Sequence, residues 1–135
     1  MRYTSTRDQR VSKTGQQAIK QGISEEGGLF VLPHLTDYRL NLQNLLGKDY
    51  ETIAQNVLTT LLPDFNTAAL KKAIQFAYHK NFSDRRLTPV RSVGDFHVLE
   101  LFHGPTSAFK DLGLQLLPQL TVSYTHLTLP TNSLV

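Results

Sequence analysis

The clearest hydrophobic pattern in the chain lies between Asp49 and Pro63. Apolar residues recur there at the spacing of three and four positions that places them on one face of an α-helix. They are Tyr50, Ile53, Ala54, Val57, Leu58, Leu61 and Leu62. Asp49 is a favourable N-cap and Pro63 stops the pattern, so a helix is predicted between them. The same reasoning predicts a second helix from an Asn66 cap to about Tyr78, with an inward face of Leu70, Ala73, Ile74 and Ala77.

Weaker patterns precede these two helices. A short strand is predicted around residues 2–4, and a helix over residues 13–21 is predicted with Ser12 as its N-cap and Gly22 as its end. Residues 24–28 combine a serine, two acids and two glycines. They predict a turn rather than a phosphate-binding loop, because no helix start follows the glycines. A short buried strand over residues 29–32 and a short helix over residues 40–46, capped by Asn41, complete this part.

The pattern changes after residue 80. Residues 81–94 are polar and irregular, and residues 96–101 predict one strand of a buried sheet. A helix is then predicted from Lys110 to about Leu120, with Pro118 interrupting it. Asp111 lies in its first turn, where the helix dipole alone accounts for an acid. The apolar side of this helix consists of Leu112, Leu114, Leu116 and Leu117.

Composition limits the classes of protein to which the chain can belong. The 135 residues are 40% hydrophobic and 19% charged, which allows one ordinary packed domain. The net charge is only +3 and the basic residues are scattered, which argues against a nucleic-acid interface. Cysteine is absent, and the five histidines lack the spacing to acids that a metal site requires. No signal-peptide core or run of roughly 20 apolar residues is present. We therefore predict a cytoplasmic protein that binds neither nucleic acid nor membrane and holds no metal.

The strongest chemical signal is the segment over residues 99–111, which runs Leu-Glu-Leu-Phe-His-Gly-Pro-Thr-Ser-Ala-Phe-Lys-Asp. An apolar run reaches a tight turn, hydroxyl residues follow, and Lys110 stands where a helix begins. An isolated lysine is usually a solvated surface residue. Here, however, Ala108, Phe109 and Leu112 are predicted to shield the Lys110 amine from water. Loss of water favours the neutral amine, which is the form that attacks a carbonyl.

Residues 101–111 resemble the lysine-bearing motif of threonine synthases, which belong to the tryptophan-synthase-β-like (fold-type II) group of pyridoxal-phosphate enzymes. Residues 3–7, Tyr-Thr-Ser-Thr-Arg, resemble the family's opening. Residues 22–31, Gly-Ile-Ser-Glu-Glu-Gly-Gly-Leu-Phe-Val, resemble its early glycine-rich segment. The resemblance covers about residues 1–120. It departs at three positions, namely Asp8, where many members have glycine, Leu32, which intervenes before Pro33, and Ser107, which fills a variable position.

The resemblance implies roles for the residues around the lysine. Lys110 would form an imine with the aldehyde of pyridoxal 5′-phosphate, and Phe109 would pack beside this cofactor or fill the core. Substrate contacts are assigned to His103, Thr106 and Ser107. Each of these three also has a structural interpretation, as a turn histidine satisfied by the backbone or as hydroxyls that serve a turn or an N-cap.

The implied reaction is that of a carbon–oxygen lyase, the conversion of O-phospho-L-homoserine and water to L-threonine and phosphate at the end of threonine biosynthesis. The Lys110 amine, once displaced by the substrate, would move protons at the substrate carbons, and the cofactor ring would store the negative charge. Two alternatives stay open. One is a related β-elimination or β-replacement enzyme, and the other is a non-catalytic interaction module.

The predicted fold class is α/β, as a fragment of the family fold. Residues 1–80 would form a helical N-terminal subdomain, and residues 81–121 the first strand, loop and helix of the cofactor-binding sheet domain. In the family, the glycine-rich phosphate cup and the group at the pyridine nitrogen lie downstream of the lysine helix. This chain alone is therefore expected to bind the cofactor poorly and to be inactive.

The C-terminal residues, from 122 onwards, do not resemble a natural protein sequence. Residues 122–131, Val-Ser-Tyr-Thr-His-Leu-Thr-Leu-Pro-Thr, are similar to the translation of a transposon-type sequencing adapter. Residues 122–135 are therefore predicted to be a non-native tail, and they are excluded from reasoning about the fold. The natural protein is then expected to continue past about Leu120.

Overall fold

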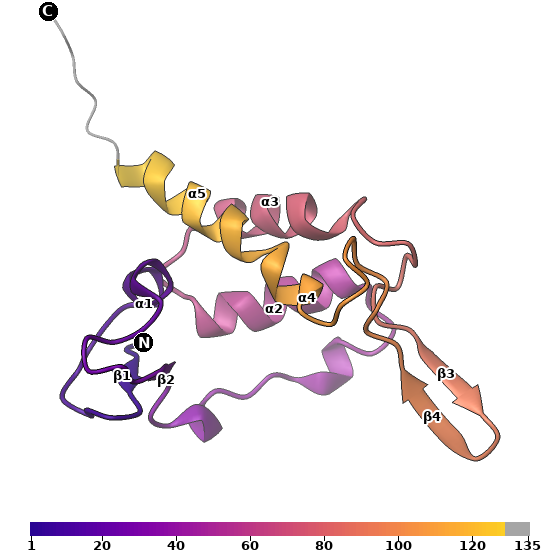
Figure 1. Ribbon diagram of the computed structural model, residues 1–135, viewed down its shortest axis with the longest axis horizontal. Coiled ribbons are helices and arrows are strands. Elements are labelled where there is room, and N and C mark those ends of the chain that lie inside the picture. Colours follow the sequence, from indigo (N-terminus) through magenta and orange to yellow (C-terminus); the bar gives the residue numbers. More distant parts are fainter. Residues whose placement is uncertain (129–135) are drawn as a thin grey trace, which may run out of the picture.

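A computed structural model of the chain describes the backbone of residues 1–128 and the side chains of residues 1–122. Two small antiparallel sheets flank a layered group of helices, with the N-terminal sheet at one end and a projecting hairpin at the other (Figure 1). The elements in chain order are β1 (Thr4–Ser5), α1 (Gly15–Gln21), β2 (Phe30–Val31), 3₁₀ turns at Leu35–Asp37 and Leu42–Asn44, α2 (Tyr50–Leu61), α3 (Thr67–Tyr78), β3 (Val90–Val93), β4 (Phe96–Leu99), α4 (Asp111–Leu114) and α5 (Leu117–Thr128).

The two strongest sequence predictions, helices α2 and α3, are confirmed with their caps. The Asp49 side chain accepts a hydrogen bond from the Thr52 amide at 2.7 Å and starts α2. The Asn66 side chain accepts from the amides of Ala68 and Ala69 and starts α3. Both caps satisfy amides that a helix start leaves without an internal partner. The described core lies between α2, α3 and the start of α5, and its buried residues are Leu62, Phe65, Leu70, Ala73, Ile74, Ala77, Tyr78, Leu87 and Leu120.

Three predictions in the N-terminal part need correction. Helix α1 is capped by Thr14 rather than Ser12, because a full capping box forms between Thr14 and Gln17. Its end at Gly22 is confirmed, with φ of 78°. The strand expected over residues 29–32 shrinks to β2 and lies partly exposed, since its pairing partner within the described residues is the equally short β1. The helix expected over residues 40–46 is a single 3₁₀ turn, although Asn41 does cap it.

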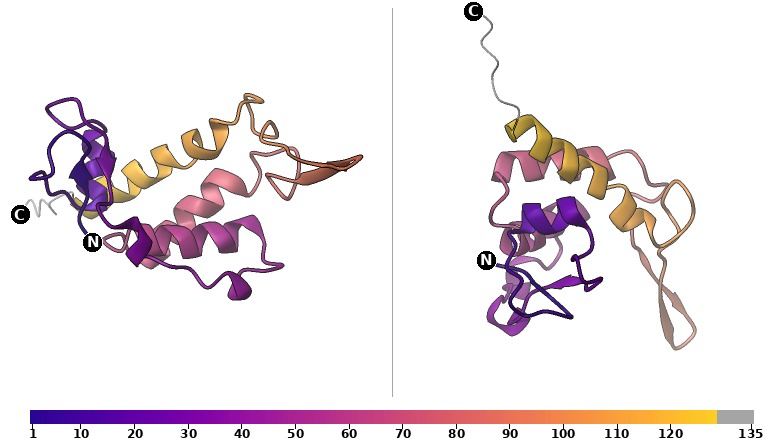
Figure 2. Two further views of the ribbon diagram at one scale, coloured as in Figure 1. Left: turned by 90° about the horizontal axis from the view of Figure 1, so that it is seen from below. Right: turned by 60° about the vertical axis from the view of Figure 1, so that its left-hand side comes forward.

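The strand expected in a buried sheet is instead half of an exposed hairpin. Strands β3 and β4 pair antiparallel, and every residue of both strands is exposed. Gly94 turns the chain with φ of 58°, which suits the first central position of a tight hairpin turn. Within residues 1–128, β4 has only β3 as a partner, so neither face of the pair is covered. The hairpin extends away from the helices in every view (Figure 2).

The last predicted helix is divided into α4 and α5. Proline lacks an amide hydrogen and its ring clashes with the carbonyl four residues earlier, so it is tolerated only in the first turn of a helix. Pro118 is accordingly the second residue of α5, and the break falls before it rather than at it. Helix α5 runs on to Thr128, so it includes the beginning of the predicted non-native tail. Residues 129–135 of that tail lie outside the described residues.

Candidate active site around Lys110

Lys110 stands immediately before α4, at the end of the loop that follows β4. Its backbone already has helical angles, with φ of −61° and ψ of −22°. The Lys110 side chain is exposed, and the neighbouring Phe109 is 64% exposed. The predicted shielding of the amine by its apolar neighbours is therefore wrong for the described residues. The physical reason is that Leu116, which follows α4, packs against the core, whereas Phe109 and Lys110 are exposed.

Asp111 fixes the loop that carries Lys110. It is only 1% exposed, and its carboxylate accepts from the Thr106 amide at 2.8 Å and from the Thr106 hydroxyl at 2.7 Å. Burial by itself raises the pKa of Asp111, but the hydrogen bonds from Thr106 and from the backbone of Ala108 outweigh it, so the pKa is lowered. The helix dipole was thus an incomplete explanation of this acid. Its main structural role is to hold the loop over residues 104–108.

Two further features of the loop follow from this packing. Gly104 is buried against Asp111, and a Cβ atom at Gly104 would lie 2.4 Å from the Asp111 Cβ. Ser107 adopts a positive φ of 57°, a conformation that is uncommon for residues other than glycine. The Ser107 amide donates to the Gly104 carbonyl at 3.0 Å and closes the turn. The Thr106 hydroxyl is therefore engaged by Asp111, whereas Ser107 is exposed.

His103 is held on both of its ring nitrogens. Nε2 lies 2.7 Å from Glu100 Oε2, and Nδ1 lies 3.2 Å from Ser83 Oγ. The hydrogen bond with His103, supported by the Arg91 guanidinium, lowers the pKa of Glu100 below its ordinary value. The Ser83 amide also donates to the His103 carbonyl at 2.9 Å. His103 thus has the satisfied environment of a structural turn residue, but its partners include side chains rather than backbone alone.

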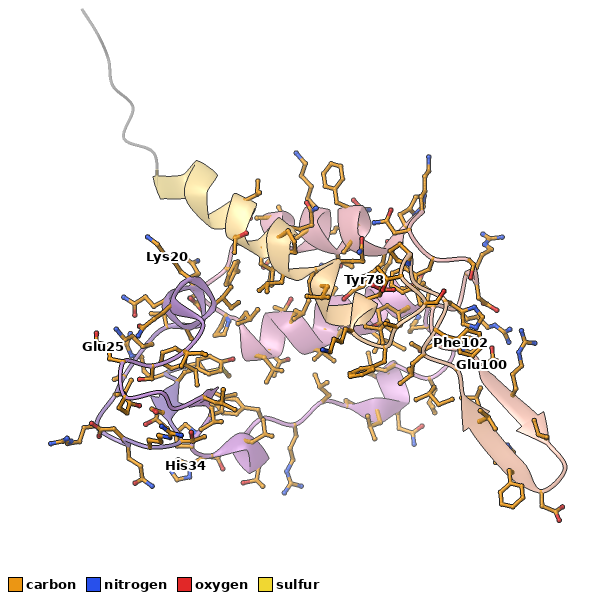
Figure 3. All side chains as sticks on the ribbon, in the orientation of Figure 1. Lys20, Glu25, His34, Tyr78, Glu100 and Phe102 are labelled. Carbon is orange, nitrogen blue, oxygen red and sulfur yellow. The ribbon has the colours of Figure 1, made fainter. Side chains whose placement is uncertain are left out.

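A charged cluster ties the base of the hairpin to the segment after α3. Asp84 pairs with Arg86 at 3.0 Å and with Arg91 at 3.6 Å, and Arg91 also reaches Glu100 at 3.5 Å. Glu100 and Phe102 lie together beside the base of the hairpin (Figure 3). The side-chain hydrogen bond from Arg86 lowers the pKa of Asp84 to about 2. This cluster therefore holds the chain on the approach to the lysine loop.

The shifted pKa of Asp84 predicts an acid-sensitive contribution to folding. Because the folded pKa is about 2 and the ordinary value is 3.8, the contribution is complete above pH 3.8 and is lost as the pH falls towards 2. We expect the Asp84→Asn variant to unfold at a lower urea concentration than the wild type at pH 6. The difference between their urea midpoints should shrink between pH 4 and pH 2. A difference that stays constant over this range would contradict the assignment.

Tyr78, the last residue of α3, makes a contact that sequence reasoning missed. The Tyr78 hydroxyl donates to the Leu112 carbonyl at 2.6 Å, which links α3 to α4. The sequence placed Tyr78 only at the approximate end of the second predicted helix. A tyrosine next to the inward face of a helix does carry a signal, because a buried hydroxyl usually finds a partner. The sequence does not identify that partner, since it lies far along the chain.

Neither a metal-ion cluster nor a membrane-spanning helix accompanies the lysine loop in the described part of the chain. Within residues 1–122, whose side chains are described, no group of three or more histidine, cysteine, aspartate or glutamate side chains is arranged to hold a metal ion. No described helix is long and apolar enough to cross a membrane. The site described above is therefore the lysine loop and the residues that hold it.

Comparison with known proteins decides the family. The family model described as "Threonine synthase N terminus" matches residues 2–78, which is more than half of the chain. The chain belongs to the threonine synthase family. This confirms the family resemblance found in the sequence. The match ends before the lysine loop, so it does not by itself assign roles to residues 103–110.

Individual threonine synthase relatives agree with this assignment. Threonine synthase-like 1 of Mus musculus is 40% identical over 111 residues, which cover 77% of this chain and 15% of the mouse protein. The threonine synthase of Pseudomonas aeruginosa is 36% identical over 123 residues, which cover 89% of this chain and 26% of that enzyme. The crystal structure of PLP-bound threonine synthase from Brucella melitensis has a TM-score of 0.82 at 30% identity, covering 93% of this chain and 28% of that one.

These matches show what share of its relatives' length the chain covers. The chain spans between 15% and 28% of the length of the three relatives. Its mixture of helices and strands agrees with the α/β class predicted from the sequence. The buried sheet of the cofactor domain, predicted to begin with residues 96–101, is not found within residues 1–128, where both sheets are small antiparallel pairs.

Proposed function

We propose that this chain is the N-terminal portion of a threonine synthase that converts O-phospho-L-homoserine and water to L-threonine and phosphate. One observation carries the proposal. In a chain of this family, Lys110 presents an exposed amine at the start of α4, on a loop that Asp111 holds in place. The PLP-bound Brucella relative supports pyridoxal 5′-phosphate as the cofactor.

The residues around Lys110 fit such a cofactor. When bound, pyridoxal phosphate supplies an aldehyde for attachment to an amine and a ring that accepts negative charge. Lys110 offers an exposed primary amine, and the exposed Phe109 ring next to it in sequence can pack against an aromatic ring. The Gly27-Gly28 turn belongs to the N-terminal sheet region, where its neighbours are Ser5, Arg7 and Glu26. That turn is already filled by the chain's own groups, so the phosphate of the cofactor must be held by other residues.

Each of the site residues on this loop then has a proposed role in the reaction. Lys110 would hold the cofactor, and its amine would move protons between the substrate carbons. Ser107 and Thr106 lie ahead of it and contact the substrate, Ser107 through its exposed side chain. His103 borders the substrate, and its ring is oriented by Glu100 and Ser83.

The proposed domain organisation keeps the boundaries of the sequence prediction. Residues 1–80 form the helical N-terminal subdomain, residues 81–121 begin the cofactor domain, and residues 122–135 are a non-native tail. The intact protein would act in the cytoplasm. A DNA read across the codon for Thr121 tests the tail, because the proposed reading frame continues into a glycine-rich segment. A genomic frame that encodes residues 122–135 and then stops would contradict it.

A comparison of three substrates, each supplied separately, tests the proposed reaction. The full-length protein is incubated with pyridoxal phosphate and either O-phospho-L-homoserine, L-serine or L-threonine. We expect equal amounts of threonine and phosphate from the first substrate and no comparable turnover of the other two. Turnover of serine or threonine in place of phosphohomoserine would instead establish a related elimination or replacement enzyme. Full activity of the 135-residue chain by itself would contradict the proposal that the catalytic unit is longer.

A further inference from the structure

The contact between α3 and α4 bears directly on the position of Lys110. Tyr78 is 4% exposed, and its ring packs edge-on against Tyr50 with ring centroids 5.0 Å apart and against Phe82 at 5.9 Å. It lies in the central part of the molecule, at the end of α3 (Figure 3). Its hydroxyl donates to the Leu112 carbonyl at 2.6 Å. A buried ring held on two sides can keep this hydroxyl in one place.

The Leu112 carbonyl depends on this hydroxyl because α4 is interrupted. In a continuous helix the Leu116 amide would donate to the Leu112 carbonyl. Here the Leu116 amide donates to Gly113 at 3.1 Å instead, since the chain must break before Pro118. The side chain of Tyr78 therefore takes the place of the missing backbone donor. A carbonyl left without any partner in this partly buried contact would be costly.

A helix as short as α4 cannot fix its own orientation. Isolated helices of this length are unstable, so the direction of α4 is set by what holds it. On the lysine side, Asp111 binds the Thr106 backbone and side chain. In addition, Tyr78 binds the carbonyl of Leu112, two positions after Lys110. The start of α4, and with it the lysine, is thus held between a local contact and a long-range one.

We propose that Tyr78 is a positioning residue for Lys110, acting through the Leu112 carbonyl to aim the amine at the reacting atoms. This inference rests on the proposed function of Lys110. Tyr78 itself touches neither cofactor nor substrate in this proposal. Through this contact, the helical part of the chain would support the catalytic position of Lys110 in addition to the fold.

The Tyr78→Phe variant removes the hydroxyl and keeps the ring that packs against Tyr50 and Phe82. In the full-length protein we expect kcat to fall about tenfold while KM changes less than about twofold, because misplacing a catalytic group costs rate more than binding. The matched control is Tyr50→Phe, which removes the hydroxyl that interacts with the Tyr78 hydroxyl but keeps the Tyr78 donor to the Leu112 carbonyl. This control should keep kcat within about twofold of the wild type.

Hydrogen exchange gives a readout that does not require activity. The amides of Gly113 and Leu114 donate to the Lys110 carbonyl at 3.0 and 2.8 Å, so they report on the start of α4. Tyr78→Phe should accelerate their exchange about five- to tenfold, the effect of losing one hydrogen bond, and Tyr50→Phe should not. The measurement is made on the full-length protein and on the 135-residue chain.

The outcomes separate the two proposals. A wild-type protein that forms no threonine and gives no borohydride-reduced pyridoxal adduct at Lys110 overturns the proposed function. Hydrogen exchange then decides alone whether the contact between Tyr78 and Leu112 holds the start of α4. An active wild type with unchanged kcat in Tyr78→Phe overturns the positioning role. A loss of activity that only follows the loss of folded protein also overturns it, as does equal exchange in both variants.

Discussion

Replacing Lys110 with alanine is expected to lower threonine formation by the full-length protein on the order of 10⁴-fold. The proposed role gives this amine two duties, the attachment of the cofactor and the transfer of protons at the substrate. Both duties require a nitrogen atom at this position, and alanine supplies none. Lys110 is exposed and is not part of the described core, so the variant should fold like the wild type. Initial rates with O-phospho-L-homoserine measure the effect.

Lys71→Ala is the matched control for this experiment. Lys71 is exposed on α3 and lies away from the lysine loop in sequence. Its removal should leave the rate within about twofold of the wild type, as expected for an exposed residue without a role. Lys110→Ala activity within tenfold of the wild type would refute the assignment of the catalytic lysine. Unfolding midpoints of both variants, measured in urea, exclude a general loss of structure.

Replacing Gly104 with alanine is expected to destabilise the 135-residue chain by roughly 1–3 kcal/mol, the usual cost of overpacking a buried position. A Cβ atom at this position would lie 2.4 Å from the Asp111 Cβ and 2.5 Å from Asp111 Oδ2. The Asp111 Cβ is close to the backbone and cannot move aside without moving the start of α4. The variant should therefore separate Asp111 from Thr106 and loosen the lysine loop. Urea unfolding followed by circular dichroism measures the loss.

Gly113→Ala serves as the control for the glycine substitution. Nothing lies within 4 Å of a Cβ atom at Gly113, and the residue is inside α4. Alanine there should stabilise the chain slightly, by about 0.4–1 kcal/mol, because it restricts the unfolded chain and favours the helix. If Gly104→Ala proved as stable as Gly113→Ala, the close packing of Gly104 on Asp111 would not exist in solution.

The local parts of the fold could be predicted from the sequence, because a cap and the helix it starts are neighbours in the chain. Asp49 and Asn66 identify the starts of α2 and α3 for this reason. Thr14 and not Ser12 caps α1, because Thr14 forms a reciprocal pair of hydrogen bonds with a second residue, Gln17. Local signals of equal strength are separated only by such additional contacts.

The wrong or missing sequence predictions concern residues whose packing partners lie far away in the chain or outside the described residues. The apolar strand β4 was expected in a buried sheet, but burial depends on neighbouring strands that residues 1–128 do not provide. The expected shielding of Lys110 failed for the same reason, since apolar neighbours in sequence shield an amine only where something packs over them. The Tyr78 contact with Leu112 spans 34 positions and has no local signal for its acceptor. The lysine motif itself was recognisable because its residues are contiguous.

The central claim, that Lys110 is the attachment point of the cofactor, can be tested by one chemical measurement. The full-length protein is mixed with pyridoxal phosphate and reduced with borohydride, and its peptides are mapped by mass spectrometry. We predict one adduct per chain, located on Lys110, and little labelling of the 135-residue chain treated in the same way. An adduct confined to another lysine, or no adduct in a protein that nevertheless forms threonine, would contradict the claim.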